Sequence, residues 1–322
     1  RFASRCSIAM LLTVILAVPS SQAFRPPADE LLPDFDRRRA VSSPTQAPDA
    51  KRTAATDALR AMVPGVRMNF DRITGSPRLI AAPDGFLTGP AGTGRAVSAK
   101  IQSQFLATDP YRATKAFLDQ HRALLKHGSE ILDDCAIARE HTTPHNGMKT
   151  VVWQQEVDGI PVFDGLLISH ITRRGELVNL SSRLLADAKN VANRLSRNRT
   201  ALIANPPVSV RRAMALAARN AGEAMDENEV AAVGSFSSGR WQKFSAKPLK
   251  GESYAALTWL PMDAGTLRLC WEIILVGRTR GEGFQIVLDA STGEILVRRG
   301  LTDHISSASY RVFTSDSPSP FS

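Results

Sequence analysis

The stretch that decides the fold runs Trp153-Gln-Gln-Glu-Val-Asp-Gly-Ile-Pro-Val-Phe-Asp-Gly-Leu-Leu-Ile-Ser-His-Ile171. From Lys149 the side chains alternate with a period of two, which is typical of a strand that is buried on one side. Asp158-Gly159 then offers a tight hairpin turn. Further strands are expected at 162–172 and 176–184, with a turn at Arg174-Gly175. The stretch therefore predicts an antiparallel meander.

A helix is expected before this meander. Thr108 or Asp109 can cap it, Pro110 suits its first position, and Gly128 follows its last turn. Its apolar face comprises Ala113, Phe117, Leu124 and Leu125. Two short strands, 66–70 and 77–81, are expected further upstream, and ordered structure is expected to begin near residue 58.

The same arrangement recurs later in the chain. Ser209 can cap a helix, and strands are expected at 255–260, 266–277, 283–289 and 294–298. The inner face of this helix comprises Val210, Ala213, Met214, Ala217 and Ala221. Residues 165–178 and 283–296 both read as a strand, a Gly-Glu corner and a second strand. We therefore expect an α+β fold of two tandem modules, each a helix packed on an antiparallel sheet in a cystatin-like manner.

The first residues have the pattern of a secretory signal peptide. Arg1 and Arg5 precede an apolar run of 11 residues at 8–18, and small residues lead up to Ala23. We expect cleavage between Ala23 and Phe24, and hence secretion or delivery to the cell envelope. The alternative is a membrane anchor, but the run is shorter than the roughly 20 residues that a membrane-spanning helix needs.

Residues 24–57 are rich in Pro, Ala, Ser and Arg, and they predict a disordered leader. The formal charge of +9 falls to +7 without residues 1–23, which contain two Arg and no acid. The basic residues are scattered and aromatic residues make up only 6% of the chain, so we expect a solvated basic surface and no nucleic-acid partner. The chain starts at Arg1 and stops in a Ser/Pro run, and we expect it to be the front part of a longer precursor.

The cysteines leave two possibilities open. Cys6 belongs to the predicted signal peptide, and Cys135 and Cys270 can form one disulfide in an oxidising compartment or remain buried free thiols. Sequence alone does not show that their Cα atoms lie close enough for a bridge.

A search for catalytic groups finds no constellation. His141-Thr-Thr-Pro-His145 has the spacing of two zinc ligands, but it lacks the glutamate of a zinc peptidase and Pro144 opposes a helix. We expect both histidines in an exposed loop, and His121 and His127 on the surface. No nucleophile motif occurs. We therefore predict no catalytic, cofactor-binding or metal-binding residue here, and we interpret Trp153, Trp259 and Trp271 as core anchors.

Two segments resemble known families. The strand region from Trp153 resembles the propeptide domain that fungalysin- and thermolysin-type metallopeptidases share, although Asp164 stands where that family has a small residue. The second module, which ends in 283–299 and carries Leu288-Asp-Ala-Ser-Thr-Gly-Glu-Ile-Leu296, resembles the PepSY domain. The residues that carry the two resemblances are Trp153, Gln155, Gly159, Pro161, Val162, Phe163 and Gly165 in the first segment and Asp289, Thr292, Gly293 and Glu294 in the second.

The resemblance implies a non-catalytic pro-region that assists folding of a downstream zinc peptidase domain of the same precursor and inhibits it. Zinc is expected only in that domain. Arg298-Arg299 can be a processing site or the basic end of a strand. The rival hypothesis is a binding or structural module of a large extracellular protein without peptidase activity, and a free-standing enzyme is disfavoured.

The expected layout is a signal peptide at 1–23, a leader at 24–57, a propeptide-like module at 58–188, a linker at 189–207, a PepSY-like module at 208–305 and a Ser/Pro linker at 306–322.

Overall fold

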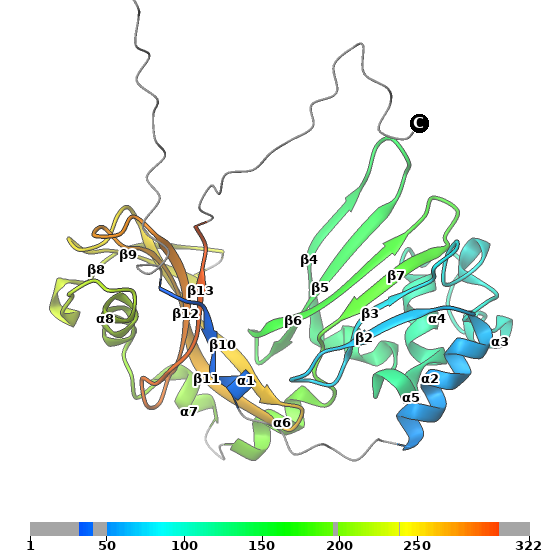
Figure 1. Ribbon diagram of the computed structural model, residues 1–322, viewed down its shortest axis with the longest axis horizontal. Helices are drawn as coiled ribbons and strands as arrows, with labels where there is room; N and C mark the ends of the chain where they lie inside the picture. The colour runs from blue at the N-terminus through cyan, green and yellow to red at the C-terminus, as the bar shows by residue number, and fades with distance from the viewer. Residues whose placement is uncertain (1–31, 41–49, 196–198, 238, 303–322) are drawn as a thin grey trace, which may run out of the picture. The chain divides into compact units, whose positions relative to one another are not determined.

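A computed structural model describes residues 32–40, 50–195, 199–237 and 239–302. The predicted signal peptide with its cleavage position at Ala23 and Phe24, and the Ser/Pro segment 306–322, lie outside these ranges. The described chain has a mixed α+β fold in which antiparallel strands predominate (Figure 1). Residues 33–302 form one compact unit.

Six strands form the first sheet, in the order β4-β5-β6-β7-β3-β2, and every neighbouring pair is antiparallel. The strands are β2 (Arg67–Phe70), β3 (Pro77–Ala81), β4 (Cys135–Thr142), β5 (Lys149–Val157), β6 (Ile160–Ile171) and β7 (Leu177–Ser182). The predicted meander is confirmed. The alternation along β5 buries Val151, Trp153 and Val157 on one face, because successive side chains of a strand point to opposite faces.

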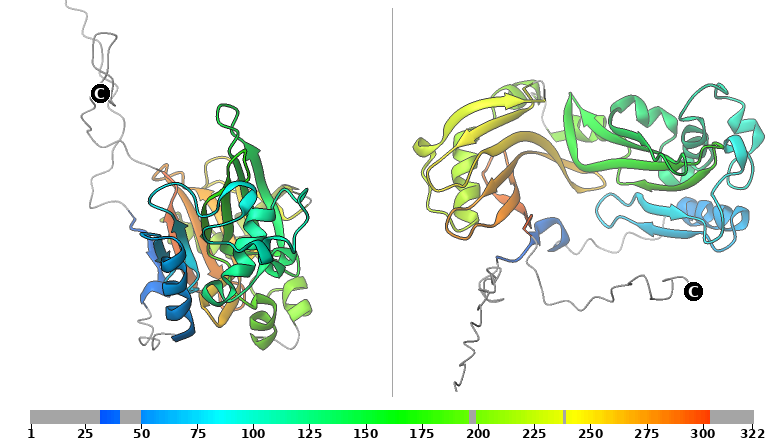
Figure 2. Two further views of the ribbon diagram at one scale, coloured as in Figure 1. Left: turned by 90° about the vertical axis from the view of Figure 1, so that its right-hand side faces the viewer. Right: turned by 90° about the horizontal axis from the view of Figure 1, so that it is seen from above.

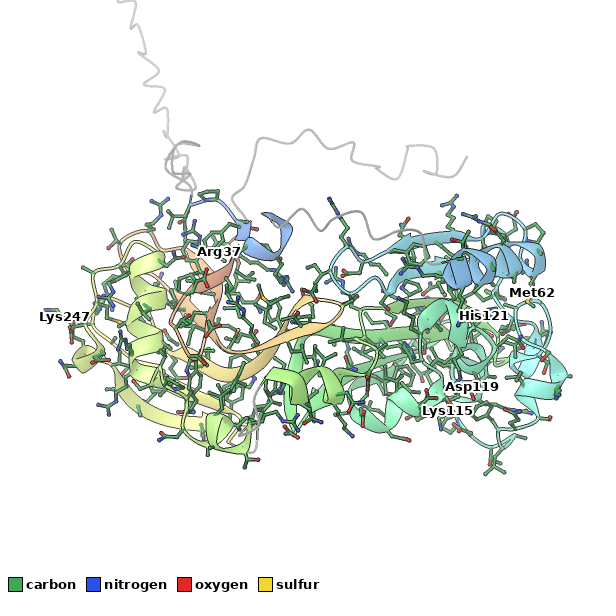
Figure 3. The ribbon with its side chains drawn as sticks, turned by 90° about the horizontal axis from the view of Figure 1, so that it is seen from below. Arg37, Met62, Lys115, Asp119, His121 and Lys247 are labelled. Atoms are coloured by element: carbon green, nitrogen blue, oxygen red, sulfur yellow. The ribbon has the colours of Figure 1, made fainter. Side chains whose placement is uncertain are left out.

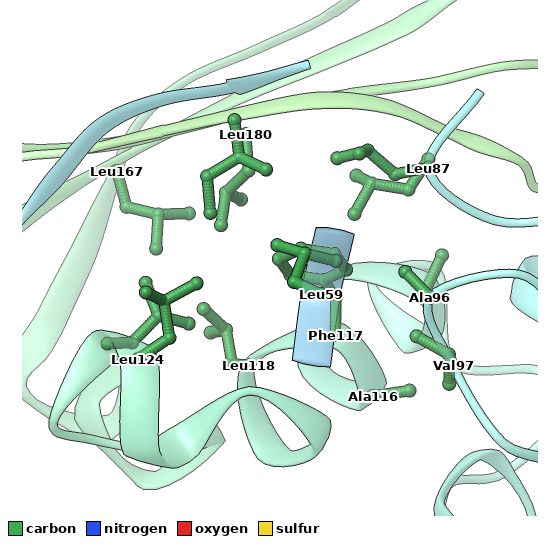
Figure 4. Close-up of a cluster of buried hydrophobic side chains, with 14 of the residues drawn as sticks. Leu59, Leu87, Ala96, Val97, Ala116, Phe117, Leu118, Leu124, Leu167 and Leu180 are labelled. Atoms are coloured by element: carbon green, nitrogen blue, oxygen red, sulfur yellow. The ribbon is translucent and has the colours of Figure 1, made fainter. Parts of the chain in front are cut away.

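Helices cover that face of the first sheet. They are α2 (Ala50–Met62), α4 (Arg112–Gln120) and α5 (Arg122–Leu125), with α3 (Ala99–Gln102) and the 3₁₀ helices η2 (Pro90–Gly92) and η3 (Ser129–Asp134) beside them. Figure 4 shows Leu59, Phe117 and Leu124 from the helices facing Leu167 and Leu180 of the strands. The predicted inner face at 113, 117, 124 and 125 is buried as expected. The helix itself is interrupted at residue 121 instead of running from 110 to 127.

Seven strands form the second sheet, in the order β1-β13-β12-β11-β10-β9-β8. The strands are β1 (Phe35–Asp36), β8 (Ala231–Phe236), β9 (Trp241–Ser245), β10 (Ser253–Asp263), β11 (Thr266–Val276), β12 (Gly283–Asp289) and β13 (Ile295–Gly300). Helix α8 (Val210–Asn220) packs on β11 and β12, and η4 (Glu227–Glu229) follows it. Ser209 caps α8 as predicted, accepting a hydrogen bond from the amide of Arg212 at 3.2 Å. Figure 2 shows the same layering from two further directions.

The structure corrects several predicted boundaries. Helix α2 begins at Ala50, and β1 and α1 (Arg37–Ala40) are ordered, so parts of the predicted leader 24–57 belong to the fold. The predicted linker 189–207 contains α6 (Ala188–Leu195) and α7 (Arg199–Ala204). Val191 and Ala192 of α6 are buried, since the helix packs against β11. These segments are short and rich in polar residues, so their helical periodicity is hard to recognise without the surface that they cover.

Two hairpins that lie far apart in the sequence have the same type of turn. In the β2–β3 hairpin, Asp71 Oδ1 accepts hydrogen bonds from the amides of residues 73 and 74, and Thr74 Oγ1 accepts one from the amide of Ser76. In the β12–β13 hairpin, Asp289 Oδ1 and Thr292 Oγ1 accept the equivalent bonds. Each turn has its glycine at positive φ, where a side chain would be strained. The Asp-x-x-Thr-Gly pattern is therefore turn chemistry.

Candidate functional site

The strand pair that carries the propeptide-like motif is held by two glutamines. The buried Gln155 side chain donates to the carbonyl of Leu185 and accepts from its amide, both at 2.9 Å. Gln154 Nε2 donates to the carbonyls of Val162 and Gly165 at 2.8 and 3.2 Å. These bonds satisfy backbone groups where the β5–β6 register shifts between residues 154 and 156. The two glutamines therefore fix the irregular part of the motif.

The turn between these strands is as predicted. Asp158 and Gly159 both have positive φ, 55° and 72°, which is the geometry that a two-residue hairpin turn requires. Arg199 ion-pairs with Asp158 at 2.5 Å and so ties α7 to the turn.

The next motif residues join the two sheets. Val162 pairs in parallel register with Trp259 of β10, and Thr258 Oγ1 donates to the carbonyl of Pro161 at 3.1 Å. Trp259 Nε1 donates to the carbonyl of Val157 at 3.1 Å. Phe163 is 5% exposed and packs into the second sheet's core with Leu260, Cys270, Val287, Leu296 and Val297. The most distinctive part of the motif is thus buried inside this chain.

Asp164 lies at the centre of a charged cluster beside this junction. Arg299 of β13 donates to both carboxylate oxygens, at 3.1 and 2.5 Å, and Arg183 lies 3.4 Å away. Burial raises the pKa of Asp164, but the hydrogen bond from Arg299 and the charges of the nearby guanidinium groups outweigh it, so that pKa is below its ordinary value. The guanidinium groups of Arg38 and Arg299 lie 5.7 and 4.8 Å from the centre of the Phe163 ring.

This cluster explains the residue at which the motif departs from the family pattern. The carboxylate of Asp164 compensates Arg299, which would otherwise hold an unpaired charge at the half-buried junction. A small cavity of about 20 Å³ remains there, enough space for roughly one water molecule. Its volume excludes a substrate-sized ligand.

The residues of the second predicted motif have structural positions. Asp289 is buried, organises the β12–β13 turn through its side chain, and forms an ion pair with Arg268 at 3.4 Å. Thr292 accepts a backbone bond within that turn, and Gly293 adopts a φ of 78°. Glu294 lies at its edge and pairs with Arg37 and Arg268. These contacts account for each of the four residues without a ligand.

Arg298 and Arg299 both lie inside β13, which pairs with β12 on one side and β1 on the other. Arg298 is 7% exposed, and its guanidinium donates to the carbonyls of Pro33 and Asn220, each at 2.8 Å. Cleavage between the two residues would require β13 to leave the sheet. The folded structure favours the basic strand end over the processing site.

The two cysteines of the described chain are free thiols. Cys135 at the start of β4 is half-buried, and burial raises the pKa of its thiol to about 12. Cys270 is fully buried on β11, and burial raises its pKa as well. Neither thiol is therefore activated as a nucleophile.

The histidines differ from the prediction in part. His121 and His127 are buried, 5% and 6% exposed, instead of lying on the surface, and their rings hydrogen-bond to the backbone carbonyls of Ala96 and Gly128. His141 lies in β4, outside a loop, while His145 is exposed in the β4–β5 turn as expected. Across the described ranges, no three His, Cys, Asp or Glu side chains lie close enough together to hold a metal ion.

The tryptophans confirm their predicted role. Trp153, Trp259 and Trp271 are 3%, 1% and 5% exposed, and Trp271 Nε1 donates to the carbonyl of Val208 at 2.8 Å. Trp241, which the sequence leaves unassigned, begins β9 and stacks on Phe236.

Strand β4 forms a free edge of the first sheet, at the opposite end from β2. Among the described residues, β5 is the one strand that pairs with it. All its residues after Cys135 are exposed, and Ile137 is 47% exposed. The sheet face turned away from the helices carries the half-buried aliphatic residues Val152, Leu166 and Ile168. This edge and face are the part of the motif region that a partner can reach.

In the portion of the chain that the structure describes, no helix is both long enough and apolar enough to cross a membrane.

Residues 133–184 match the family model described as the Fungalysin/Thermolysin Propeptide Motif. The match spans β4 to β7 and therefore includes both the junction and the free edge. No curated protein matches the chain. Among solved structures, the Bacillus megaterium YpeB C-terminal domain is similar, with 13% identity over 78% of this chain and 97% of that chain and a TM-score of 0.27.

The matched segment thus carries a motif of thermolysin- and fungalysin-type propeptides, which implies a propeptide of such a peptidase. Propeptide domains of this kind are non-catalytic. The PepSY resemblance of residues 288–296 stays a prediction.

Proposed function

We propose that this chain is the pro-region of a secreted zinc metallopeptidase, and that it assists folding of the peptidase domain and inhibits it until it is cleaved away. The observation that carries the proposal is the propeptide motif at residues 133–184. In this proposal the zinc ion belongs to the peptidase domain, the second sheet is a PepSY-like module, and the signal peptide at 1–23 directs the precursor out of the cytoplasm.

The accessible part of the motif region supports a binding role. An unpaired strand edge can accept an extended segment of another chain through backbone hydrogen bonds. Strand β4 offers such an edge over eight residues, and it contributes little to the core of its own sheet. The aliphatic side chains at Val152, Leu166 and Ile168 extend this surface.

Binding alone is sufficient for the proposed action. A pro-region that binds the folded peptidase and not the unfolded one stabilises the folded form in proportion to its affinity. While both parts are one chain, the effective concentration of the pro-region is high, and cutting the connection lowers it. Inhibition then ends when the pro-region dissociates.

The coding sequence that follows Ser322 provides the first test. We expect it to encode a peptidase domain with a His-Glu-x-x-His helix, because this spacing directs two imidazoles at one zinc ion. A downstream region without a zinc motif contradicts the proposal and favours the binding or structural module of an extracellular protein.

An inhibition assay tests the free edge. The chain added to the mature peptidase should slow hydrolysis. Ile137→Asp should raise the inhibition constant about tenfold, since the introduced carboxylate on the binding edge must be desolvated when the peptidase binds. Val233→Asp on β8 is the matched control, because Val233 is 49% exposed on the free edge of the second sheet. Equal weakening by both variants, or none by either, excludes β4 as the binding edge.

A further inference from the structure

We propose that His121 and His127, two imidazoles that the fold buries beside the helices of the first sheet, make this half of the chain sensitive to mild acid. The proposal deepens the proposed function by adding a means of regulation, and it rests on that function only for its consequence, the release of the peptidase. Its physical basis is the cost of placing a charged imidazolium where water cannot reach it.

His121 occupies the break between α4 and α5 (Figure 3). Its Nε2 donates to the carbonyl of Ala96 at 2.8 Å, and its ring lies 4.5 Å from the Phe117 ring, between centroids. Phe117 is fully buried at the centre of the helix-to-sheet core. His121 therefore connects the covering loop, the helix break and the core.

His127 follows α5 and is buried with one nitrogen unpartnered. Its Nδ1 lies 3.1 Å from the carbonyl of Gly128, while its Nε2 has no hydrogen-bond partner among the described residues. Protonation would place an N–H and a positive charge at that buried nitrogen, with no acceptor for it. The neutral ring is the form that this site accommodates.

The charged groups around the two rings do not offset this cost. Near His127, the carboxylate of Glu130 favours the imidazolium and the guanidinium of Arg122 opposes it, and these two groups bind each other at 2.6 Å. Asp119 is engaged by Arg122 and by the amide of Ser129. On α2, which packs against α5, Asp57 and Arg60 pair at the surface. No charged group contributes to the lowered pKa of His121, whose Nε2 bonds to the Ala96 carbonyl and whose ring lies against that of Phe117.

The direction of the effect follows from these surroundings. Burial lowers the pKa of His121 to about 4 and lowers that of His127, against 6.5 for an ordinary imidazole. Because the unfolded chain binds these protons more readily than the folded chain, protonation favours unfolding. The contribution of the two neutral imidazoles to stability is therefore fully present above pH 6.5, and it is lost as the pH falls toward the folded-state pKa values. From pH 7.5 to 5.0, the lowered pKa of His121 alone should raise the unfolding equilibrium constant about 30-fold.

Urea unfolding of the 322-residue chain at pH 7.5 and 5.0 tests the proposal without any peptidase. We expect the unfolding constant of the wild type to rise at least about 30-fold. In the double variant His121→Gln/His127→Asn the rise should be at least about tenfold smaller than in the wild type, and what remains includes the contribution of His170, whose pKa burial also lowers. Gln and Asn keep a donor near the Ala96 and Gly128 carbonyls and cannot titrate. His145→Gln, at an exposed position of the β4–β5 turn, is the matched control and should behave as the wild type. A double variant with the full pH response overturns the proposal.

A second measurement applies if the double variant does not fold. The ring signals of His121 and His127 in wild-type protein, followed by NMR, should remain those of neutral imidazole at pH 5.5. Protonation of both rings near pH 6.5 overturns the proposal. The inhibition assay at the two pH values then tests release separately. If the chain unfolds in acid but does not inhibit the peptidase at pH 7.5, the proposed function is contradicted and the histidine mechanism still stands.

Discussion

Asp164 illustrates how one residue that departs from a family pattern is accommodated by a partner far along the chain. Its carboxylate binds Arg299, 135 positions away, beside the Phe163 ring. A small residue at 164 would leave the guanidinium of Arg299 without its counter-charge. The pair therefore couples the motif strand β6 to β13, the last strand of the described chain.

Replacing Asp164 by Asn should lower the free energy of unfolding by about 2 kcal/mol, because hydrogen bonds to charged partners are lost at a half-buried site. Urea unfolding at pH 7 measures the change. Since the pKa of Asp164 is lowered by folding, its contribution is present above about pH 4, and the difference between wild type and variant should shrink below it. Asp57→Asn, in an exposed pair with Arg60, should change stability by less than about 0.5 kcal/mol. An equal loss in both variants contradicts the role given to Asp164.

At the scale of elements, residues 33–40 act as a strap on the second sheet. Strand β1 extends the sheet beyond β13, and the Arg38 guanidinium binds Asp36 at 2.7 Å while donating to the carbonyl of Pro261 at 3.3 Å. Both side chains of the pair are at most 6% exposed. The strap thus covers the edge of β13 and the rim of the sheet junction.

Arg38→Ala should lower the free energy of unfolding by about 3 kcal/mol, because the buried Asp36 carboxylate would lose its ion pair and hydrogen bonds with this guanidinium. Arg37→Ala removes a neighbouring arginine that is 57% exposed, so we expect less than about 1 kcal/mol. Thermal and urea unfolding of the two variants provide the comparison. Similar losses for both would show that the strap contributes little.

For the whole molecule, the decisive feature is the contact that the motif makes between the two sheets. The parallel pairing of Val162 with Trp259 and the insertion of Phe163 into the second core connect them. Packed cores that share side chains unfold together, because disrupting one exposes the other.

Phe163→Ala should therefore lower stability by about 3–5 kcal/mol and separate the unfolding of the two sheets. Unfolding can be followed by tryptophan fluorescence and by far-ultraviolet circular dichroism. The two transitions should coincide in the wild type and diverge in the Phe163 variant. Phe236→Ala, at a side chain that is 40% exposed, should leave them coincident. Coincident transitions in the Phe163 variant would exclude the coupling.

The sequence by itself determined the local features of this protein. The period-two pattern of 149–157, the Asp158-Gly159 turn, the cap at Ser209 and the buried helix faces depend on neighbours a few residues apart, and they appear in the structure as expected. Only the tertiary structure decided that His121 and His127 are buried, that Phe163 belongs to the second core, and that Asp164 meets Arg299. These contacts join residues that periodicity cannot relate, since burial depends on which surfaces meet after the chain has folded.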